Sequence, residues 1–229
     1  MSLTRRNFMI GAGAAGALAA TGLQEAEAAA SGLTLKQQAA YFGPVIQDSG
    51  VDFRSTNFRK INARWRRQFV PYESIEPQGS VVIDATNHFL YVIFENQTAL
   101  RYGVGVGRDG FRWYGRARID RKQKWPRWTP PPEMRARHPE LPEYIDGGAT
   151  NPLGPRAMYL FRQGRDLGYR LHGTLEPWSI GTNASSGCIR MFNEDVIDLY
   201  QRCPIGTRVL VLKVLGAPVI DEAAPVDTQ

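Results

Sequence analysis

The sequence is poor in residues that build cross-linked or metal-bound cores. Only two cysteines, Cys188 and Cys203, occur in 229 residues, which excludes a disulfide scaffold. No C-x-x-C or H-E-x-x-H spacing is present, so the usual zinc signatures are missing and we expect neither a metal nor another cofactor. Beyond the first 30 residues no apolar run approaches the roughly 18–20 residues that span a bilayer. The composition also excludes collagen-like, coiled-coil and wholly disordered chains.

Positive charge is concentrated in two stretches. Residues 54–67 hold six Lys or Arg and no acid, and residues 109–137 hold nine against three acids. Since the whole chain carries only +6, the remainder is mildly acidic. Each stretch is either a solvated loop or a contact for an anionic partner, which could be nucleic acid, a lipid headgroup or an acidic polymer.

The N-terminus has the three parts of an export signal. The pair Arg5-Arg6 precedes a Gly/Ala-rich apolar stretch over residues 10–18, and Ala26-Glu27-Ala28 offers a cleavage site. The pair resembles a twin-arginine signal, with an ordinary secretory signal as the alternative. No cysteine lies near the cleavage site, which argues against a lipoprotein. We therefore expect residues 1–28 to be a signal peptide, and the mature protein to act in the periplasm without a stable membrane anchor.

The mature chain divides into three further parts. Residues 29–78 are expected to be a partly ordered leader with a short helix over 33–42. Residues 79–215 are expected to form a mainly β domain, with a hairpin over 81–94 and strands over 100–106, 157–161, 168–172 and 207–212. Within this domain, residues 108–150 are rich in Arg, Trp and Pro and predict a long excursion without long regular elements. Residues 216–229 are expected to be a loose tail.

One helix is expected after residue 193. Asn193 suits an N-cap, acidic residues follow it in the first turn, and Pro204 ends the helix. Helical spacing predicts one buried face, made by Val196, Ile197, Tyr200 and Cys203. Cys203 should therefore be a buried free thiol and not a disulfide partner of Cys188.

The most unusual motif is Ser185-Ser186-Gly187-Cys188-Ile189-Arg190-Met191. A cysteine shortly before a helix N-terminus lies where backbone N–H groups converge, a setting that favours a thiolate and can stabilise an oxyanion. His172 stands 16 residues upstream at the end of a predicted strand. A nucleophilic thiol needs such a base, and the base needs an acceptor that orients its ring. A buried structural cysteine and an unreactive loop histidine are the alternatives at this point.

A family resemblance covers residues 79–215. The segments His172-Gly173-Thr174, Pro177–Gly181 and Ser185–Met191 together resemble the signature of L,D-transpeptidases with a YkuD-type catalytic domain. Residues 151–154, 195–200 and 204–207 also match. The resemblance implies a mainly β, sandwich-like catalytic domain with one helix after the cysteine motif.

The resemblance also implies cysteine acyl transfer on peptidoglycan stem peptides. Cys188 would attack the carbonyl of the third stem residue and release the terminal D-alanine, with His172 as proton donor and acceptor. The Gly173 carbonyl would orient His172, and the Gly187 and Cys188 N–H groups would form the oxyanion hole. Substrate contacts would come from Ser186, Arg190 and Trp178.

The acyl acceptor stays open in the sequence. A second stem peptide would give a 3-3 cross-link, a lipoprotein lysine would give protein attachment, and water would give L,D-carboxypeptidase action. The alternative from a different functional class is a non-catalytic module that binds the cell wall. Stem peptides carry free carboxylates, which would suit the two basic stretches, whereas no nucleic-acid partner is expected.

The excursion is expected to border the Cys188 cleft. It carries Trp113, Trp125 and Trp128, and we expect these rings to pack on substrate. Arg121, Lys122 and Lys124 are expected to grip substrate carboxylates. The alternative is a structural flap whose tryptophans only pack on the domain.

Overall fold

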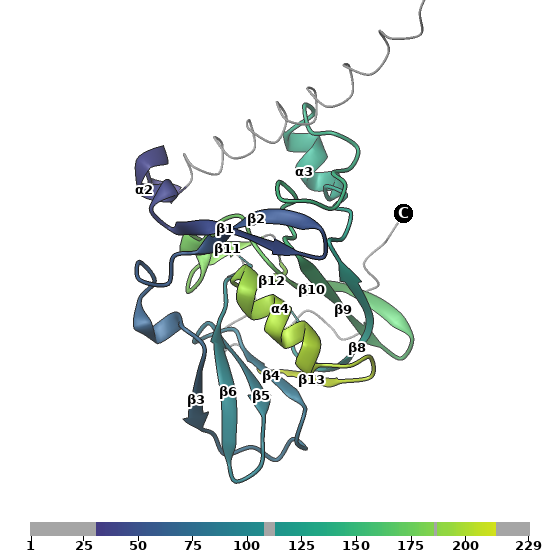
Figure 1. Ribbon diagram of the computed structural model, residues 1–229. Helices are drawn as coiled ribbons and strands as arrows, with labels where there is room; N and C mark the ends of the chain where they lie inside the picture. Colours follow the sequence, from purple (N-terminus) through teal and green to yellow (C-terminus); the bar gives the residue numbers. More distant parts are fainter. Residues whose placement is uncertain (1–30, 108–112, 186, 214–229) are drawn as a thin grey trace, which may run out of the picture.

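The structure of the protein is a computed structural model that describes residues 31–107, 113–185 and 187–213 (Figure 1). The expected signal peptide and C-terminal tail lie outside these residues. The helices are α2 (Leu35–Ala39), α3 (Pro132–Arg137) and α4 (Asn193–Arg202), with 3₁₀ turns η1 (Ala63–Trp65) and η2 (Pro177–Ser179). In the described part of the chain, no helix has the length and apolar character needed to cross a membrane.

Strands dominate the rest of the domain, which confirms the mainly β expectation. They are β1 (Phe42–Asp48), β2 (Val51–Thr56), β3 (Gln68–Pro71), β4 (Val81–Asp84), β5 (Phe89–Ile93), β6 (Thr98–Gly103), β7 (Val106–Gly107), β8 (Gly115–Lys124), β9 (Arg156–Arg162), β10 (Arg165–His172), β11 (Asn183–Ser185), β12 (Ile189–Arg190) and β13 (Arg208–Val211).

Nine described strands form one mixed sheet in the order β12-β10-β9-β8-β13-β4-β5-β6-β3. Most neighbours are antiparallel, but β10 pairs with β12, and β13 with β4, in parallel. The predicted hairpin is present, because β4 and β5 pair with Val81 opposite Val92 and Ile83 opposite Leu90. Two small sheets, β1–β2 and β7–β11, lie outside the large one.

The main core lies between the large sheet and α4, which crosses in front of it in Figure 1. Val196, Leu199 and Cys203 are completely buried on the inner side of the helix. Leu199 was not among the predicted face residues, whereas Ile197 and Tyr200 are only half-buried. Cys203 is a free thiol, as predicted, and burial raises its pKa to about 12.

Asn193 does not cap α4, which corrects the sequence expectation. The cap residue is Phe192, which makes no side-chain capping bond, and Asn193 is the first helical residue. The Asn193 Oδ1 instead accepts a hydrogen bond of 2.9 Å from the Thr174 backbone N–H. Its side chain therefore connects the helix start to the loop that follows β10.

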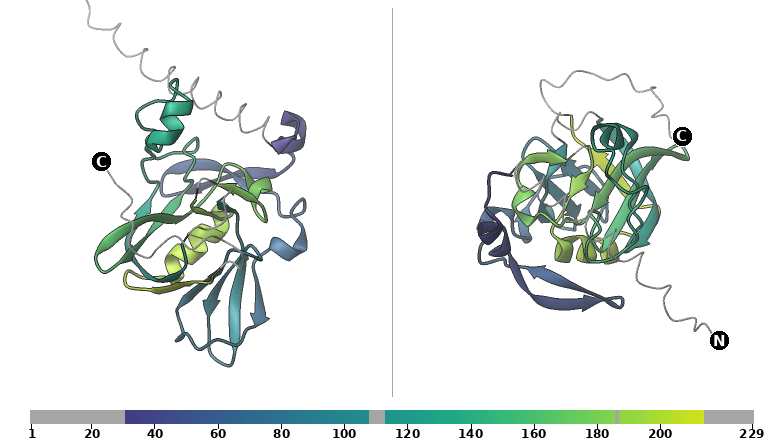
Figure 2. Two further views of the ribbon diagram at one scale, coloured as in Figure 1. Left: turned by 180° about the vertical axis from the view of Figure 1, so that it is seen from behind. Right: turned by 90° about the horizontal axis from the view of Figure 1, so that it is seen from above.

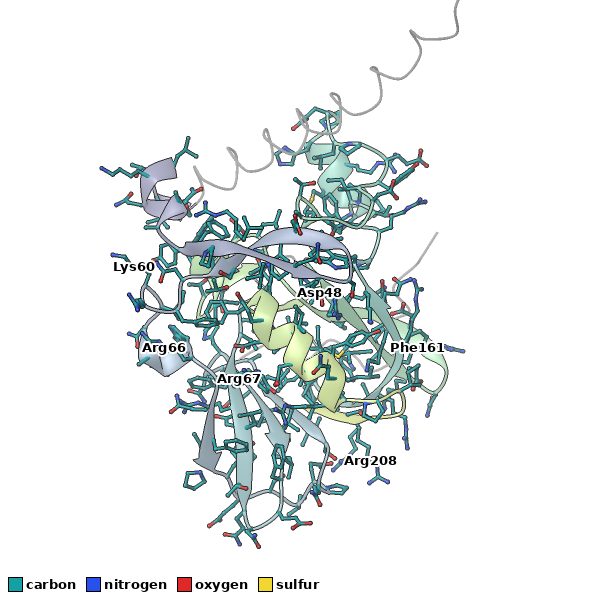
Figure 3. The ribbon with its side chains drawn as sticks, viewed as in Figure 1. Asp48, Lys60, Arg66, Arg67, Phe161 and Arg208 are labelled. Carbon is teal, nitrogen blue, oxygen red and sulfur yellow. The ribbon has the colours of Figure 1, made fainter. Side chains whose placement is uncertain are left out.

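The segment before residue 79 is regular where it is described, so the partly ordered leader is also corrected. Asp48, labelled in Figure 3, lies at the turn of the β1–β2 hairpin and forms a two-pronged ion pair with the buried Arg156 at 2.6 and 2.7 Å. At the other end of the hairpin, Glu194 of α4 accepts from the N–H and hydroxyl of Thr56. Figure 2 shows the hairpin along one side of the domain. The large sheet itself begins at β3, ahead of the expected boundary.

The expected excursion contains a long strand of the central sheet, which is a further correction. The ten residues of β8 pair with β13 on one side and β9 on the other. Ala117 and Ile119 are buried at alternate positions, while charged residues occupy the exposed positions between them. Only the remainder, around α3, projects from the sheet edge (Figure 1).

Candidate active site

The parallel pairing of β10 and β12 brings the two halves of the motif together. Leu171 lies opposite Ile189 and His172 opposite Arg190, and the Met191 N–H donates to the His172 carbonyl at 2.9 Å. Leu171 and Ile189 are completely buried in the main core. Because side chains alternate along a strand, His172 and Arg190 face the other side of the sheet.

Cys188 immediately precedes β12, one step before Ile189. The same register places it opposite Arg170, on the face of the sheet that also carries His172. Strand spacing puts the Cα atoms of Cys188 and His172 about 8 Å apart, a separation that two side chains on one face can bridge. The structure therefore brings the predicted cysteine, just before β12, and the histidine at the end of β10 to one edge of the sheet.

His172 is buried, and the Gly173 carbonyl fixes its ring. The Nδ1 atom lies 2.6 Å from the Gly173 oxygen. A carbonyl oxygen can only accept, so Nδ1 carries the proton and Nε2 is left as the basic nitrogen. Burial, followed by the nearby positive charges of Arg190 and Arg170, lowers the His172 pKa to about 3. The imidazole is consequently neutral at pH 7.

Only glycine fits at position 173. A Cβ there would lie 2.3 Å from the Asn193 Oδ1 and 2.8 Å from a ring carbon of Pro155. The absence of a side chain lets the β10 end, the start of α4 and the 153–155 turn meet closely. The Gly173 carbonyl is thereby held where it can accept from His172.

The surroundings of the Cys188 thiol disfavour the thiolate that the sequence suggested. Burial raises its pKa, although a hydrogen bond from the Arg170 backbone and the guanidinium groups of Arg170 and Arg190 act in the opposite direction. The motif also does not run directly into the helix, since β12 intervenes before α4. The helix N-terminus therefore lies farther from Cys188 than the sequence spacing suggested.

Gly187 has a backbone conformation that favours glycine. Its φ of +135° lies in a region that L side chains rarely adopt. This conformation turns the chain between β11 and β12, directly before Cys188. Ser186, an expected substrate contact, lies outside the described residues.

Arg190 forms an ion pair with Glu176 through its Nη1. Both side chains are largely buried, at 17% and 12% exposure, so this pair is shielded from solvent. The pair links β12 to the loop between β10 and η2. Arg190 was expected to contact substrate, and in the described structure its guanidinium holds the loop after His172 through Glu176.

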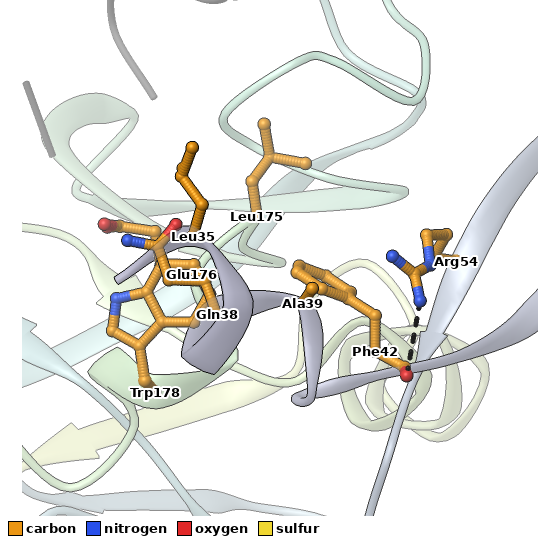
Figure 4. Close-up of a pocket in the computed structure, with 8 residues that line it drawn as sticks. All are labelled: Leu35, Gln38, Ala39, Phe42, Arg54, Leu175, Glu176 and Trp178. Carbon is orange, nitrogen blue, oxygen red and sulfur yellow. Dashed lines mark hydrogen bonds between the residues drawn. The ribbon is translucent and has the colours of Figure 1, made fainter. Parts of the chain in front are cut away.

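Trp178 lies in η2 and contacts the N-terminal segment. Its ring meets those of Tyr41 and Phe42 edge-on, with centroids 5.9 and 6.2 Å apart. Its buried Nε1 has no hydrogen-bond partner among the described residues. Trp178 also borders a pocket of about 170 Å³ between the segment around α2 and the loop after β10 (Figure 4), whose other lining residues are Leu35, Gln38, Ala39, Phe42, Arg54, Leu175 and Glu176.

Asn151 organises the loop that covers this edge of the sheet, a role that the sequence analysis missed. It is completely buried, and its Nδ2 lies 2.9–3.1 Å from the carbonyl oxygens of Pro126, Ile145 and Asp146. Three residues later, Gly154 packs so closely on Gly173 that a Cβ would lie 3.0 Å from its Cα. The Asn-Pro-Leu-Gly segment was the only signal of this role in the sequence. A short motif of this kind does not indicate which distant carbonyl groups its asparagine will contact.

Two residues of the excursion, Trp125 and Lys122, make contacts that differ from those expected. Trp125 donates from Nε1 to the carbonyl and carboxylate oxygens of Asp48 at 3.0 and 2.9 Å, so its polar end holds the N-terminal hairpin. Lys122 donates to the Tyr200 and Cys203 carbonyls at the end of α4, at 2.5 and 2.6 Å. Neither contact supports the expected grip on substrate.

Trp113 lies closer to the cysteine motif. It stacks on Tyr169 with ring centroids 6.1 Å apart, and a Cβ on Gly187 would lie 3.8 Å from that tyrosine. Trp128 exchanges backbone hydrogen bonds with Ile145 inside the covering loop. One of the three tryptophans thus lies near Gly187, and the other two stabilise the excursion and its attachment.

Residues 78–211 match the family described as YkuD, the L,D-transpeptidase catalytic domain. The chain belongs to this family. The match spans more than half of the chain and contains both His172 and Cys188.

Curated relatives carry the same family name. The chain is 32% identical over 155 residues to the probable L,D-transpeptidase ErfK/SrfK of Escherichia coli, covering 62% of this chain and 48% of that protein. It is 44% identical over 98 residues to a putative L,D-transpeptidase of Fuscovulum blasticum, covering 43% and 49%. The chain thus spans about half the length of these relatives.

Among solved structures, one of a Brucella melitensis protein is 46% identical, covers 68% of this chain and 99% of that one, and has a TM-score of 0.46. Its title describes that protein as a probable carnitine operon oxidoreductase. The family match and the curated relatives both name L,D-transpeptidases instead.

Proposed function

We propose that this protein is a peptidoglycan L,D-transpeptidase that uses Cys188 as its nucleophile. The observation that carries the proposal is the pairing of β10 and β12, which sets His172 opposite Arg190, two residues after Cys188, with Nδ1 held by the Gly173 carbonyl. A neutral imidazole next to a neutral thiol is suited to general-base activation of that thiol. Family membership supports acyl transfer as the reaction class.

The first half of the reaction forms a thioester. The Cys188 sulfur attacks the carbonyl of the third stem residue while the thiol proton passes to Nε2 of His172. The negative charge on the carbonyl oxygen is stabilised by the N–H groups of Gly187 and Cys188. When the intermediate collapses, the C–N bond to the terminal D-alanine breaks, and His172 returns the proton to the leaving amine.

The second half transfers the acyl group. An acceptor amine loses a proton to His172, attacks the thioester carbonyl and restores the thiol. If the amine belongs to a second stem peptide, the product is a 3-3 cross-link, which is the reaction we favour. A lipoprotein lysine or water as acceptor would give protein attachment or L,D-carboxypeptidase action with the same acyl-enzyme.

The substrate contacts proposed here are Trp178, Arg190 and Ser186. Trp178 borders the pocket after η2, and Arg190 orders the neighbouring loop through Glu176. The same proposal places the protein in the periplasm, exported by a twin-arginine-type signal in residues 1–28, where peptidoglycan stems are the donor and acceptor.

Product analysis separates the proposed reaction from its alternatives. Purified protein is incubated with a disaccharide-tetrapeptide, and the products are identified by mass spectrometry. A dimer that has lost one alanine indicates transpeptidation, a tripeptide indicates carboxypeptidase action, and unchanged substrate contradicts enzymatic function. Cys188→Ala and His172→Ala should each abolish product, whereas Cys203→Ala is the matched control for loss of a thiol.

A further inference from the structure

A row of side chains crosses the sheet from β8 to Cys188. Arg121 of β8 lies opposite Tyr159 of β9, Tyr159 lies opposite Arg170 of β10, and the Arg170 backbone hydrogen-bonds to Cys188, which directly precedes β12. Directly paired residues share one face of a sheet. The row therefore lies on the face that carries the proposed nucleophile.

A β-bulge turns Arg121 toward this face. Ala117 and Ile119 are buried, and simple alternation would aim residue 121 into the core with them. The register shifts between Ile119 and Arg121, so the extra residue Asp120 reverses the alternation. Lys122 consequently points to the α4 side, where it binds helix carbonyls, and Arg121 points to the opposite side.

Tyr159 forms a platform between two guanidinium groups. The Arg121 Cζ lies 4.3 Å from the Tyr159 ring centroid, and the Arg170 Cζ lies 4.6 Å from it. The Tyr159 hydroxyl donates to the Gln123 side-chain oxygen at 2.5 Å, which fixes the ring. Stacking on the ring orients the Arg121 guanidinium, which also hydrogen-bonds to Tyr159 and has further N–H groups for a ligand.

The two arginines differ in how their charge is balanced. Arg170 forms a two-pronged ion pair with Asp166, at 2.8 and 3.0 Å. Arg121 is exposed, and among the residues that the structure describes no carboxylate pairs with it. Arg121 is thus an oriented cation on the active face whose charge no described acid neutralises.

We propose that Arg121 binds a carboxylate of the peptide stem, as a specificity determinant for the reaction described above. Its guanidinium lies over Tyr159, two strands from Cys188, and its own strand β8 is three strands away, so strand spacing puts the guanidinium about 10–14 Å from the cysteine. The carboxylate of the terminal alanine lies too close to the attacked carbonyl to reach that position. The free carboxylate of the γ-linked glutamate, which precedes the attacked residue, lies roughly 9 Å away in an extended chain. This inference rests on the proposed function for the identity of the ligand.

Binding measurements test the inference separately from catalysis. Two stem tetrapeptides are used, one with the glutamyl carboxylate free and one with it amidated, and both are titrated into Cys188→Ala protein. Adding Arg121→Gln should weaken binding of the free-acid stem about 5–20-fold, as expected for an exposed charge-assisted pair, and leave the amidated stem unchanged. Lys124→Gln is the matched control, because Lys124 is an exposed cation of the same strand opposite Arg156, on the other face.

The outcomes distinguish the two proposals. Equal effects of Arg121→Gln on both stems, or no effect on either, would overturn the carboxylate subsite, as would the absence of detectable binding of either stem. Selective weakening together with wild-type protein that turns over neither stem would support the subsite and overturn the proposed function. Arg121→Lys should recover only part of the affinity, because lysine keeps the charge but loses the two-pronged geometry.

Discussion

The two basic stretches have the same net charge and different uses. In residues 54–67, the basic side chains make contacts within the stretch itself and, through Arg67, with α4. Arg64 lies over the Trp65 ring at 4.7 Å, Arg66 donates to the Ile61 carbonyl at 2.8 and 3.1 Å, and Arg67 pairs with Asp198 at 2.8 Å. Figure 3 labels Arg66, at the end of η1, and Arg67.

The second stretch, residues 109–137, is divided between the two faces of a sheet. Lys122 holds the end of α4 from one face, and Arg121 lies on the face of Cys188. Arg116 pairs with the nearly buried Glu76 at 2.6 Å. The comparison teaches that net charge over a stretch does not reveal a binding surface, because strand alternation and one bulge decide which cation faces the site.

The largest effect should come from Lys122→Met, which keeps most of the aliphatic chain and removes the ammonium group. Two helix carbonyls would lose their donor in a partly buried place, so the free energy of unfolding should fall by about 2–3 kcal/mol. Urea denaturation measures the loss. Lys124 lies two residues farther along β8 and is exposed, so Lys124→Met should change the free energy of unfolding by less than about 0.5 kcal/mol. Equal effects of the two substitutions would show that the bonds from Lys122 to the helix carbonyls add nothing beyond an exposed charge on the same face of β8.

A smaller, pH-dependent effect should come from Asp195, which faces Arg67 at 3.8 Å. Burial raises the Asp195 pKa to about 7, against the opposing charge of Arg67. Between about pH 4 and pH 7 the folded protein then holds a proton that the unfolded chain has lost, so stability falls as the pH rises through this window. The pKa of Asp198 is lowered, so its titration makes stability rise with pH, and it does so only in more acidic solution.

Asp195→Asn removes this titration. The wild-type free energy of unfolding should decrease by roughly 1–3 kcal/mol between pH 5 and pH 8, and the variant should lose less over the same range. Urea midpoints at the two pH values provide the measurement. An equal change in the free energy of unfolding between the two pH values for both proteins would show that Asp195 is ionised in the folded state at both.

The smallest effect should come from Arg64→Ala. Arg64 is exposed and stacks over Trp65 and Phe89 at 4.7 and 5.5 Å. An exposed cation–π contact contributes about 0.5–1 kcal/mol, so stability should fall by no more than that. Stem binding should be unchanged if the first basic stretch has no contact with substrate. A loss of stem affinity comparable to that of Arg121→Gln would assign the first stretch to the substrate as well.

Local patterns in the sequence predicted much of the sheet and one helix. The β4–β5 hairpin and α4 follow from alternation, helical spacing and the final proline. The strand β8 was missed because its exposed positions carry charges, and its two buried residues, Ala117 and Ile119, give only a short apolar pattern. The N-terminal hairpin was missed because its attachment depends on distant partners, such as Arg156 for Asp48.

The candidate site shows the same division between local and distant information. Cys188, His172 and Gly173 could be named from the motif, since they occupy the two segments that β10 and β12 pair. The ion pair between Arg190 and Glu176, the bond from the Thr174 N–H to Asn193 and the surroundings that raise the Cys188 pKa depend on packing between segments. These contacts disfavour the expected thiolate and turn the expected cap into a connector of the His172 loop.

The most direct test of the account is the location of the acyl group on the protein. Wild-type protein is mixed with a tetrapeptide donor or a carbapenem, quenched rapidly and digested, and the modified cysteine is identified by mass spectrometry. The account predicts a single adduct on Cys188, none on the buried Cys203, and none in Cys188→Ala. A covalent adduct on Cys203, or turnover retained in Cys188→Ala, would contradict it.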